Sequence, residues 1–294
     1  MEAKLPARLG VAIVLIAAVC FATNHVAARV AFDHGTGVAT AVTVRAAGTA
    51  LFLLVLMRLQ GVRIALQRAT LARLALLGLL VAVQSYCLSS AVAIIPAALA
   101  LLVFQTCPML YVLLSWAMGK ETPRPQTFAA MVLALAGLAL ALNLDPDKFA
   151  ARWSELGIGV TWAFAAAMSF SAVYYMNSHS LKSVDGRLRT FAMTAVTAVL
   201  VLIGGGISGN LVVPRDGAGW VGIAFLTVFY CVAMSSLFFV LPRLSAASTA
   251  ALNFEPIAVL ALAWIFLGQA VAPLQIVGAF VTVAAIAWLG VSKK

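Results

Sequence analysis

Long apolar segments follow one another along the whole chain of 294 residues, separated by short stretches in which polar and charged residues gather. A helix that crosses the hydrocarbon core of a bilayer needs roughly 20 apolar residues. The pattern predicts ten such helices, at residues 9–31, 38–58, 71–93, 97–118, 125–143, 156–178, 188–207, 219–241, 247–267 and 273–291. We therefore expect an all-α integral membrane protein with ten transmembrane helices.

The composition supports this class. Hydrophobic residues make up 64% of the chain and charged residues 10%, whereas a soluble domain is about half apolar and a quarter charged. The first apolar segment follows Lys4 and Arg8, as in a secretory signal peptide, but it continues without a convincing cleavage site, so we expect a membrane span. All the cysteines lie inside predicted spans and none forms a CxxC motif, which favours a packing role: Cys20, Cys87, Cys107 and Cys231.

The end of the chain repeats an earlier part of it. Residues 97–141 and 245–289 each consist of a long apolar segment with a central proline, a glycine-containing turn and a second apolar segment. Residues 148 positions apart align as Pro108 with Pro256, Trp116 with Trp264 and Pro125 with Pro273, and a slip of one residue then aligns Gly119 with Gly268. The repeat predicts two five-helix halves, residues 1–143 and 156–294, joined by an outer linker at residues 144–155.

The positive charge is distributed unevenly over the two predicted faces of the membrane. If the N-terminus is cytoplasmic, fourteen basic residues lie on the inner face: Lys4, Arg8, Arg58, Arg63, Arg68, Arg73, Lys120, Arg124, Lys182, Arg187, Arg189, Arg243, Lys293 and Lys294. Only four lie on the outer face: Arg29, Lys148, Arg152 and Arg215. This positive-inside asymmetry predicts that both termini are cytoplasmic and explains the net charge of +10 without a nucleic-acid partner.

An odd number of spans in each half has a consequence for symmetry. The second half enters the membrane from the face opposite to the first, so the two halves form an inverted pair about an axis in the membrane plane. Many carriers that move solutes across membranes are built in this way, with the solute bound near the midplane between the repeats.

At this point the chain resembles a known family, the EamA-like ten-helix transporters of the drug/metabolite transporter superfamily. The resemblance spans nearly the whole chain and is carried by residues 23–24, Arg45, residues 245–247, Glu255-Pro256, residues 264–268 and residues 273–278. It implies a 5+5 inverted-repeat carrier, usually an exporter of amino acids or other metabolites. The chain departs from the family pattern at Cys107-Pro108, where an acidic residue would have made a symmetric pair of carboxylates with Glu255.

Glu255 is the only acidic residue inside a predicted span. A charge at mid-bilayer costs about 2.5–3.5 kcal/mol on insertion scales, so some partner must offset it. The carboxyl group can stay protonated, shuttle a proton or accept a substrate ammonium. It can also form a structural charge pair with Arg45, because the rise of the two helices places the residues at depths that differ by only about 8 Å.

Pro108 and Pro256 occupy matching depths in the two halves. Proline lacks an N–H and clashes with the carbonyl group four residues earlier, so each should kink or break its helix. Unpaired backbone groups are tolerated in a membrane only against protein or a water-lined cavity. We expect these two helices to bind substrate or to gate its passage, although kinks that merely help the bundle to pack would leave the same pattern.

Polar and aromatic residues inside the spans form a candidate lining for a substrate cavity. Amides and hydroxyls can replace water around a zwitterion, and aromatic faces accept an apolar side chain or a cation. Each such residue taken alone also suits a hydrogen bond between helices. The candidates, with Glu255, are Asn24, His25, Gln84, Tyr86, Phe104, Gln105, Tyr111, Trp162, Ser169, Tyr174, Tyr230 and Asn253.

The sequence contains no motif that indicates nucleotide binding or metal binding. No G-x-x-x-x-G-K-[ST] motif is present, and His25, His34 and His179 are scattered without metal-ligand spacing, so we expect no cofactor, no metal and no enzyme activity. We predict a transporter of the inner (plasma) membrane, functional as a monomer, that exports amino acids by alternating access. Alternatives are export of nucleosides, cationic drugs or other metabolites, or a membrane-embedded enzyme or scaffold of lipid metabolism.

Overall fold

The computed structural model describes residues 7–61, 68–120, 122–142, 149–181, 184–240, 254–269 and 272–291. Within these ranges the regular elements are all helical. In chain order they are α1 (Ala7–Asp33), α2 (Val38–Leu59), α3 (Arg68–Ile94), α4 (Ala97–Phe104), α5 (Cys107–Ala117), α6 (Pro125–Ala141), α7 (Phe149–Tyr175), the π-helix η2 (Met176–Ser180), α8 (Gly186–Ile207), α9 (Gly217–Val240), α11 (Glu255–Leu267) and α12 (Pro273–Val291).

The helices account for the predicted membrane spans. Among the described residues, seven segments are long and apolar enough to cross a bilayer, and α4 and α5 together form one of them. The shorter apolar helices α6, α11 and α12 coincide with the predicted fifth, ninth and tenth spans. The all-α membrane architecture is therefore confirmed, although residues 247–253 of the ninth span lie outside the described residues. Helix α7 begins at Phe149, inside the segment predicted as a linker.

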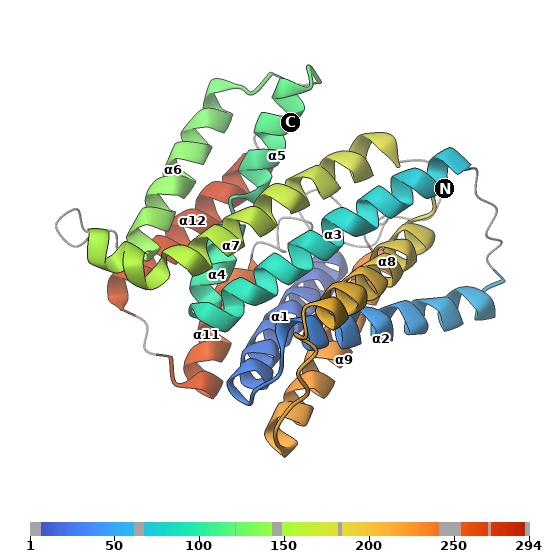
Figure 1. Cartoon of the computed structure of the whole chain (residues 1–294). Coiled ribbons are helices and arrows are strands. Elements are labelled where there is room, and N and C mark those ends of the chain that lie inside the picture. The colour runs from blue at the N-terminus through green and yellow to red at the C-terminus, as the bar shows by residue number, and fades with distance from the viewer. Residues whose placement is uncertain are drawn as a thin grey trace.

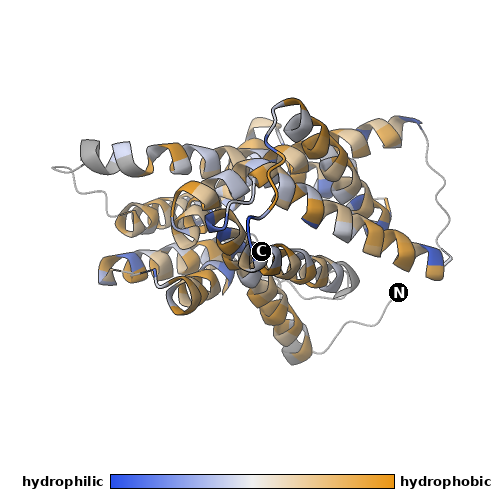
Figure 2. Ribbon diagram, turned by 60° about the horizontal axis from the view of Figure 1, so that its bottom comes forward, coloured by the Kyte–Doolittle hydropathy of each residue, from blue (hydrophilic) through white to orange (hydrophobic). Residues whose placement is uncertain are grey.

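Large apolar side chains face outward along the helices, as expected for a surface in contact with lipid. Leu51, Val132, Ile158 and Phe266 are each more than 60% exposed, and Figure 2 shows hydrophobic residues along most of the helical ribbon. A soluble monomer rarely exposes so much contiguous apolar surface. The interior is packed instead with small residues, many of them alanines that let helices approach closely.

The contacts between helices have two-fold symmetry. Exchanging the halves pairs α1 with α7, α2 with α8, α3 with α9, α4 and α5 with α11, and α6 with α12. By this exchange, the contact between α1 and α9 is equivalent to the contact between α7 and α3. In the same way, the contact between α3 and α8 is equivalent to the contact between α9 and α2. The pairs α2–α8 and α6–α12 map onto themselves and lie on opposite sides of the molecule in Figure 1. Since successive spans alternate in direction, these self-equivalent pairs are antiparallel, and the fold is a 5+5 inverted repeat.

The repeated prolines occupy equivalent positions at the starts of helices. Pro125 and Pro273 are the first residues of α6 and α12. Pro108 and Pro256 are the second residues of α5 and α11. Proline is tolerated in the first turn because the N–H there has no partner within the helix. The fourth span is therefore interrupted between Phe104 and Cys107, rather than bent within one continuous helix.

The repeated glycines end the helices α5 and α11. Gly119 and Gly268 both have a positive φ, 66° and 60°, which glycine adopts without strain. Beyond them, the Lys120 N–H donates to the Ser115 carbonyl at 3.0 Å, and the Gln269 N–H donates to the Ala263 carbonyl at 3.3 Å. The second closure spans one residue more than the first. This extra residue explains the slip of one position in the alignment of the repeats.

Helices α6 and α12 cross on the two-fold axis with almost no side chain between them. The Thr282 hydroxyl donates to the Ala134 carbonyl at 3.4 Å, and these two residues are 148 positions apart. A Cβ added to Gly278 would lie 2.6 Å from the Gly137 carbonyl oxygen and still closer to the Ala141 backbone nitrogen. Small residues on both helices allow this close approach of the two backbones.

At one end of the bundle, predicted as the outer end, the α1–α2 loop packs against the α8–α9 loop. The Arg215 N–H donates to the His34 carbonyl at 3.1 Å, and the Gly37 N–H donates to the Val212 carbonyl at 2.9 Å. His34 Nδ1 lies 2.7 Å from Asp216 Oδ2. The Gly219 N–H, which donates to the Asp216 carboxylate, and then the His34 side chain hold the pKa of that carboxyl group below its usual range.

We predict that Gly278→Ala destabilises the protein by about 1–3 kcal/mol, because the new methyl group must push apart two helix backbones. Thermal unfolding in detergent measures this as a lower Tm. Gly204→Ala in α8 is the matched control, since an added Cβ there meets nothing within 4 Å. It should leave Tm unchanged or raise it slightly. Equal Tm values for the two variants would contradict the packing assigned to Gly278.

We also predict a pH-dependent effect of Asp216→Asn. Because the folded-state pKa of the carboxyl group is lowered, its contribution to stability is fully present above the ordinary Asp value of about 3.9 and is lost as the pH falls through the lower folded-state value. The variant should therefore unfold at a lower temperature than the wild type at pH 7 and pH 5, with the gap closing near pH 3. Asp33→Asn, which removes an exposed ion pair with Arg29, should change Tm little. A gap of the same size at all three pH values would exclude this role of Asp216.

Candidate functional site

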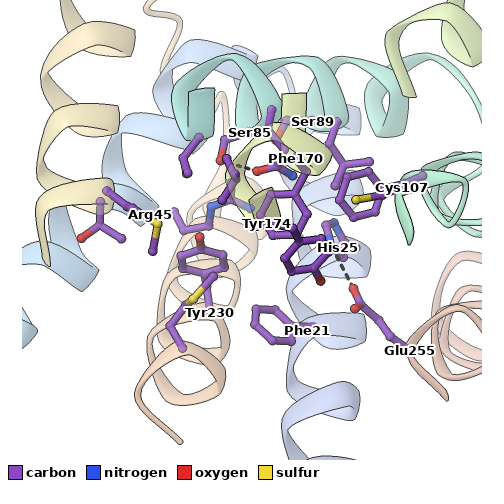
Figure 3. Close-up of a pocket in the computed structure, with 18 of the residues that line it drawn as sticks. Phe21, His25, Arg45, Ser85, Ser89, Cys107, Phe170, Tyr174, Tyr230 and Glu255 are labelled. Carbon is purple, nitrogen blue, oxygen red and sulfur yellow. Dashed lines mark hydrogen bonds and ion pairs between the residues drawn. The ribbon is translucent and has the colours of Figure 1, made fainter. Parts of the chain in front are cut away.

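A cavity of about 260 Å³ lies where the two halves of the protein meet. Residues of α1, α2, α3, α4 and α5 from the first half and of α7, η2, α8, α9 and α11 from the second half form its wall (Figure 3). The lining residues are Phe21, His25, Arg45, Val81, Gln84, Ser85, Leu88, Ser89, Phe104, Gln105, Cys107, Pro108, Phe170, Val173, Tyr174, Asn177, Met193, Thr194, Tyr230, Met234 and Glu255.

Many of the residues singled out in the sequence meet at this cavity. Those that line it are His25, Arg45, Gln84, Phe104, Gln105, Pro108, Tyr174, Tyr230 and Glu255. They lie on eight helices from both halves of the chain, with Gln105 between α4 and α5. These helices are α1, α2, α3, α4, α5, α7, α9 and α11. The interrupted fourth span supplies Phe104, Gln105 and Pro108 at the point where it breaks.

Other predicted residues do not line this cavity. Tyr86 and Trp162 pack against each other, with ring centroids 6.2 Å apart. The Ser169 hydroxyl donates to the Leu80 carbonyl at 2.7 Å, so it joins two helices. Asn24 is fully buried beside the cavity, and Tyr111 contacts Tyr174 from behind at a centroid distance of 6.3 Å. Pro256 is buried in the first turn of α11, and Asn253 lies outside the described residues.

Glu255 is the first residue of α11, at the N-terminus of a helix that begins inside a predicted span. The free N–H groups of a helix N-terminus stabilise a negative charge. His25 Nε2 of α1 lies 3.3 Å from Glu255 Oε1. The carboxyl group is therefore stabilised by its own helix and by an imidazole of the other half, and the contact joins the two halves across the cavity.

The charge pair between Arg45 and Glu255, which the sequence offered as one role for Glu255, is not formed in the structure. Among the described residues, the Arg45 guanidinium has no carboxylate within 4.0 Å and lies over the ring of Tyr230, 4.3 Å from its centroid. Figure 3 shows this pair on one side of the cavity and the His25–Glu255 pair on the other. The two helices bring the charges to similar depths, but they face the cavity from different directions.

Aromatic rings form much of the cavity wall between these two pairs. Phe170 contacts Phe104 at a centroid distance of 5.5 Å and Tyr174 at 4.7 Å. Phe21 contacts Tyr230 edge to face at 6.0 Å. Amides and hydroxyls interrupt the rings, chiefly Gln84, Gln105, Ser85 and Ser89. The cavity can therefore accept an apolar group against the rings while polar atoms bind near either end.

Helix α7 changes to a π-helix, η2, at the edge of the cavity. The Arg189 guanidinium donates to the carbonyls of Asn177 and Leu181 at 3.2 and 3.3 Å, which binds this irregular turn to α8. Asn177 lines the cavity from η2. Single π-turns occur frequently at functional sites, since the wider turn redirects the side chains that follow.

The sequence analysis missed several lining residues, although some could have been found from helical spacing. Phe21 lies one turn before His25 on α1, and Phe170 lies one turn before Tyr174 on α7. Ser85 follows Gln84 directly. The sequence favoured a packing role for Cys107, yet this residue lines the cavity at the helix position equivalent to Glu255. No group of three potential metal ligands was found among the described residues.

Comparisons with known proteins agree with this architecture. A crystal structure of another protein aligns with 95% of this chain and 97% of its own, with a TM-score of 0.65 and 21% sequence identity, a likeness that concerns the fold alone. No curated protein matches the chain significantly. The model of the EamA-like transporter family matches the chain twice, over residues 8–143 and 157–291. Since these two matches cover most of the sequence, the chain belongs to the EamA-like transporter family.

Proposed function

We propose that this membrane transporter exports amino acids, aromatic ones included, from the cytoplasm by alternating access. The observation that carries the proposal is the cavity between the two inverted halves, with aromatic rings in its wall and charged groups of opposite sign on its two sides. A carrier with inverted repeats binds its solute between the repeats near the midplane, and the cavity lies at that interface.

The cavity suits a small zwitterion with an apolar side chain. Its volume of about 260 Å³ is just below the range of roughly 300–1,000 Å³ typical of small-molecule sites. A metabolite of amino-acid size is therefore a better match than a lipid. Phe104, Phe170 and Tyr174 offer ring faces to the side chain, and Gln84 and Gln105 offer adaptable amides. A lining of this kind favours a broad range of substrates.

Two further arguments concern the substrate and the location of the protein. The whole chain resembles the aromatic amino-acid exporter YddG, a general similarity that is not carried by one diagnostic motif. The excess of basic residues on the predicted inner face supports an inner (plasma) membrane location with both termini in the cytoplasm. The described residues of the cavity wall come from both halves of one chain, and we propose that a monomer is sufficient for transport.

Helices α5 and α11 are proposed to take part in gating. Both begin next to the cavity, at Cys107-Pro108 and at Glu255-Pro256. A helix that begins in mid-membrane can tilt about the break without losing hydrogen bonds of its own ladder. Glu255 also contacts His25 of the opposite half, so movement of α11 relative to α1 would break and remake this contact.

The proposed function is tested by counterflow in liposomes that contain the purified protein. The panel consists of labelled amino acids, nucleosides and cationic drugs, each at two pH values. We expect accumulation of amino acids, phenylalanine among them, and little of the other two classes. Liposomes without protein give the background. Absence of amino-acid flux in either direction, with flux of a nucleoside or a drug, would reject the proposed substrate class.

Glu255→Gln is predicted to lower transport by about tenfold or more, or to abolish its pH dependence, because the amide cannot ionise, transfer a proton or attract a substrate ammonium group as a carboxylate does. Initial rates of phenylalanine counterflow at both pH values measure this effect. Asp33→Asn is the matched control, since it makes the same change at a carboxylate outside the cavity. Wild-type kinetics for Glu255→Gln, with normal expression and Tm, would exclude both a substrate role and a proton role.

We further predict that His25→Gln and Glu255→Gln are not additive. The two side chains are in contact, so a double-mutant cycle on Tm should give a coupling energy of about 0.5–3 kcal/mol. The cycle needs the two single variants, the double variant and the wild type under one set of conditions. Pairing His25→Gln with Asp33→Asn provides a second cycle, expected to be additive. Additive effects in the first cycle would contradict the contact between the two halves.

A further inference from the structure

Arg45 is a buried cation with little to compensate it. Its side chain extends from α2 into the wall of the cavity, and the residue is only 6% exposed. The Nε atom is buried and has no hydrogen-bond partner. The guanidinium makes one hydrogen bond to a described residue, from Nη1 to Asn24 Oδ1, at 3.5 Å. That distance is beyond the usual range for N–H···O bonds.

Even this hydrogen bond depends on how the Asn24 amide is oriented. When the amide is turned over, its nitrogen donates to the Leu226 carbonyl at 3.1 Å and its oxygen accepts from the His25 N–H at 3.3 Å. This orientation satisfies both ends of the amide, and it leaves no acceptor facing Arg45. The ring of Tyr230 then provides the remaining contact. A ring face recovers only part of what a guanidinium loses when it leaves water.

Four carboxylates whose side chains the structure describes have partners other than Arg45. Asp33 pairs with Arg29, Asp185 with Arg187, Asp216 with His34 and Glu255 with His25. Glu255 contacts His25 rather than Arg45, on the other side of the cavity (Figure 3). On the side where Tyr230 lies, the Arg45 guanidinium therefore has no carboxylate partner among the described side chains.

A solute that fills the cavity must restore the hydrogen bonds that water gives to Arg45 when the cavity is open. A carboxylate does this best, because its two oxygens match the planar fork of donors on a guanidinium. A neutral amide offers one oxygen and brings N–H groups that meet no acceptor there. A cationic solute would be repelled on this side of the cavity.

We propose that Arg45 is the anchor for the carboxylate group of the transported solute, with Tyr230 holding the guanidinium in place from below. The proposal rests on the proposed function in using the same cavity, and it adds that the cavity selects solutes that carry a carboxylate. The apolar part of the solute then lies toward Phe170 and Tyr174, away from Arg45 (Figure 3).

The test compares three ligands that differ only at their charged ends. Phenylalanine carries both charges, phenylalaninamide lacks the carboxylate, and 3-phenylpropanoate lacks the ammonium group. Each competes against labelled phenylalanine in counterflow, and each is also scored by the shift in Tm that it gives the protein in detergent. For the wild type we expect phenylalanine and 3-phenylpropanoate to bind at least tenfold more tightly than phenylalaninamide.

Arg45→Gln should weaken binding of the two carboxylates by about 10- to 100-fold while changing that of phenylalaninamide little. The unchanged amide serves as an internal test that the variant is folded. Arg45→Lys should keep part of the preference, since it retains the charge but not the fork. Arg29→Gln is the matched control, because it removes a cation that bonds Asp33 and the α3 backbone outside the cavity. It should leave the acid-to-amide ratio unchanged.

The outcomes separate this inference from the proposed function. If the wild type binds phenylalaninamide as tightly as phenylalanine, or if Arg45→Gln weakens both equally, Arg45 is not a carboxylate anchor, and amino-acid transport still stands. If phenylalanine is not transported but 3-phenylpropanoate raises Tm in an Arg45-dependent manner, the amino-acid assignment fails and the anchor stands. If neither carboxylate competes or shifts Tm, the anchor is overturned.

Discussion

The interruption of the fourth span before Cys107-Pro108, with α11 beginning at the equivalent Glu255-Pro256, is the constraint on which this structure depends. In hydrocarbon a backbone N–H or C=O group without a partner is costly, so a broken helix is tolerated only against protein or a cavity. Helix α5 begins at such a break, α11 begins at the equivalent residue, and the cavity lies beside both helix starts. Pro108 and Pro256 are tolerated there because the N–H group that proline lacks has no partner in the first turn of a helix. Thus the same residues that begin these two helices determine where a polar ligand can be held.

The two halves are symmetric in backbone and asymmetric in chemistry at this point. Cys107 and Glu255 are equivalent first residues of α5 and α11, and only the second can carry charge. A carboxylate at the N-terminus of α11 is favoured by the helix and needs one further partner, which His25 supplies. Because Glu255 is satisfied in this way, it does not neutralise Arg45. The asymmetry between cysteine and glutamate therefore leaves one cation for the ligand to bind.

The sequence predicts the fold well because the relevant signals are one-dimensional. Span length follows from bilayer thickness, inversion follows from an odd number of spans, and the repeat is visible in Pro125 and Pro273 because each must begin a helix. The helix rise also gives the depth of a residue, which is why Arg45 and Glu255 were placed at similar depths. Depth does not give the direction in which a side chain points, and that direction depends on how neighbouring helices are rotated. For this reason the charge pair of Arg45 with Glu255, one of the roles considered for Glu255, is not found in the structure.

The same limit explains the errors in the predicted lining. Asn24 and His25 are adjacent polar residues in α1, and their sequence neighbours do not reveal which one faces the cavity. Tyr86 and Trp162 are residue types that suit a cavity lining, but their rings pack against each other instead. Asn177 enters the lining through the π-turn of η2, a local change of helix that no spacing rule at this position would suggest.

The two ends of the bundle are held together by contacts of different kinds, which bears on how the halves could alternate. At the end predicted as outer, main-chain hydrogen bonds join the α1–α2 and α8–α9 loops. The symmetry-equivalent end joins the start of α8 to the end of α2 through exposed side chains, with Arg187 Nη1 donating to Gln60 Oε1 at 2.6 Å. A contact between exposed side chains contributes little to stability, whereas paired backbone groups in packed loops resist separation. Opening at the predicted outer end would therefore have to break main-chain hydrogen bonds between two packed loops.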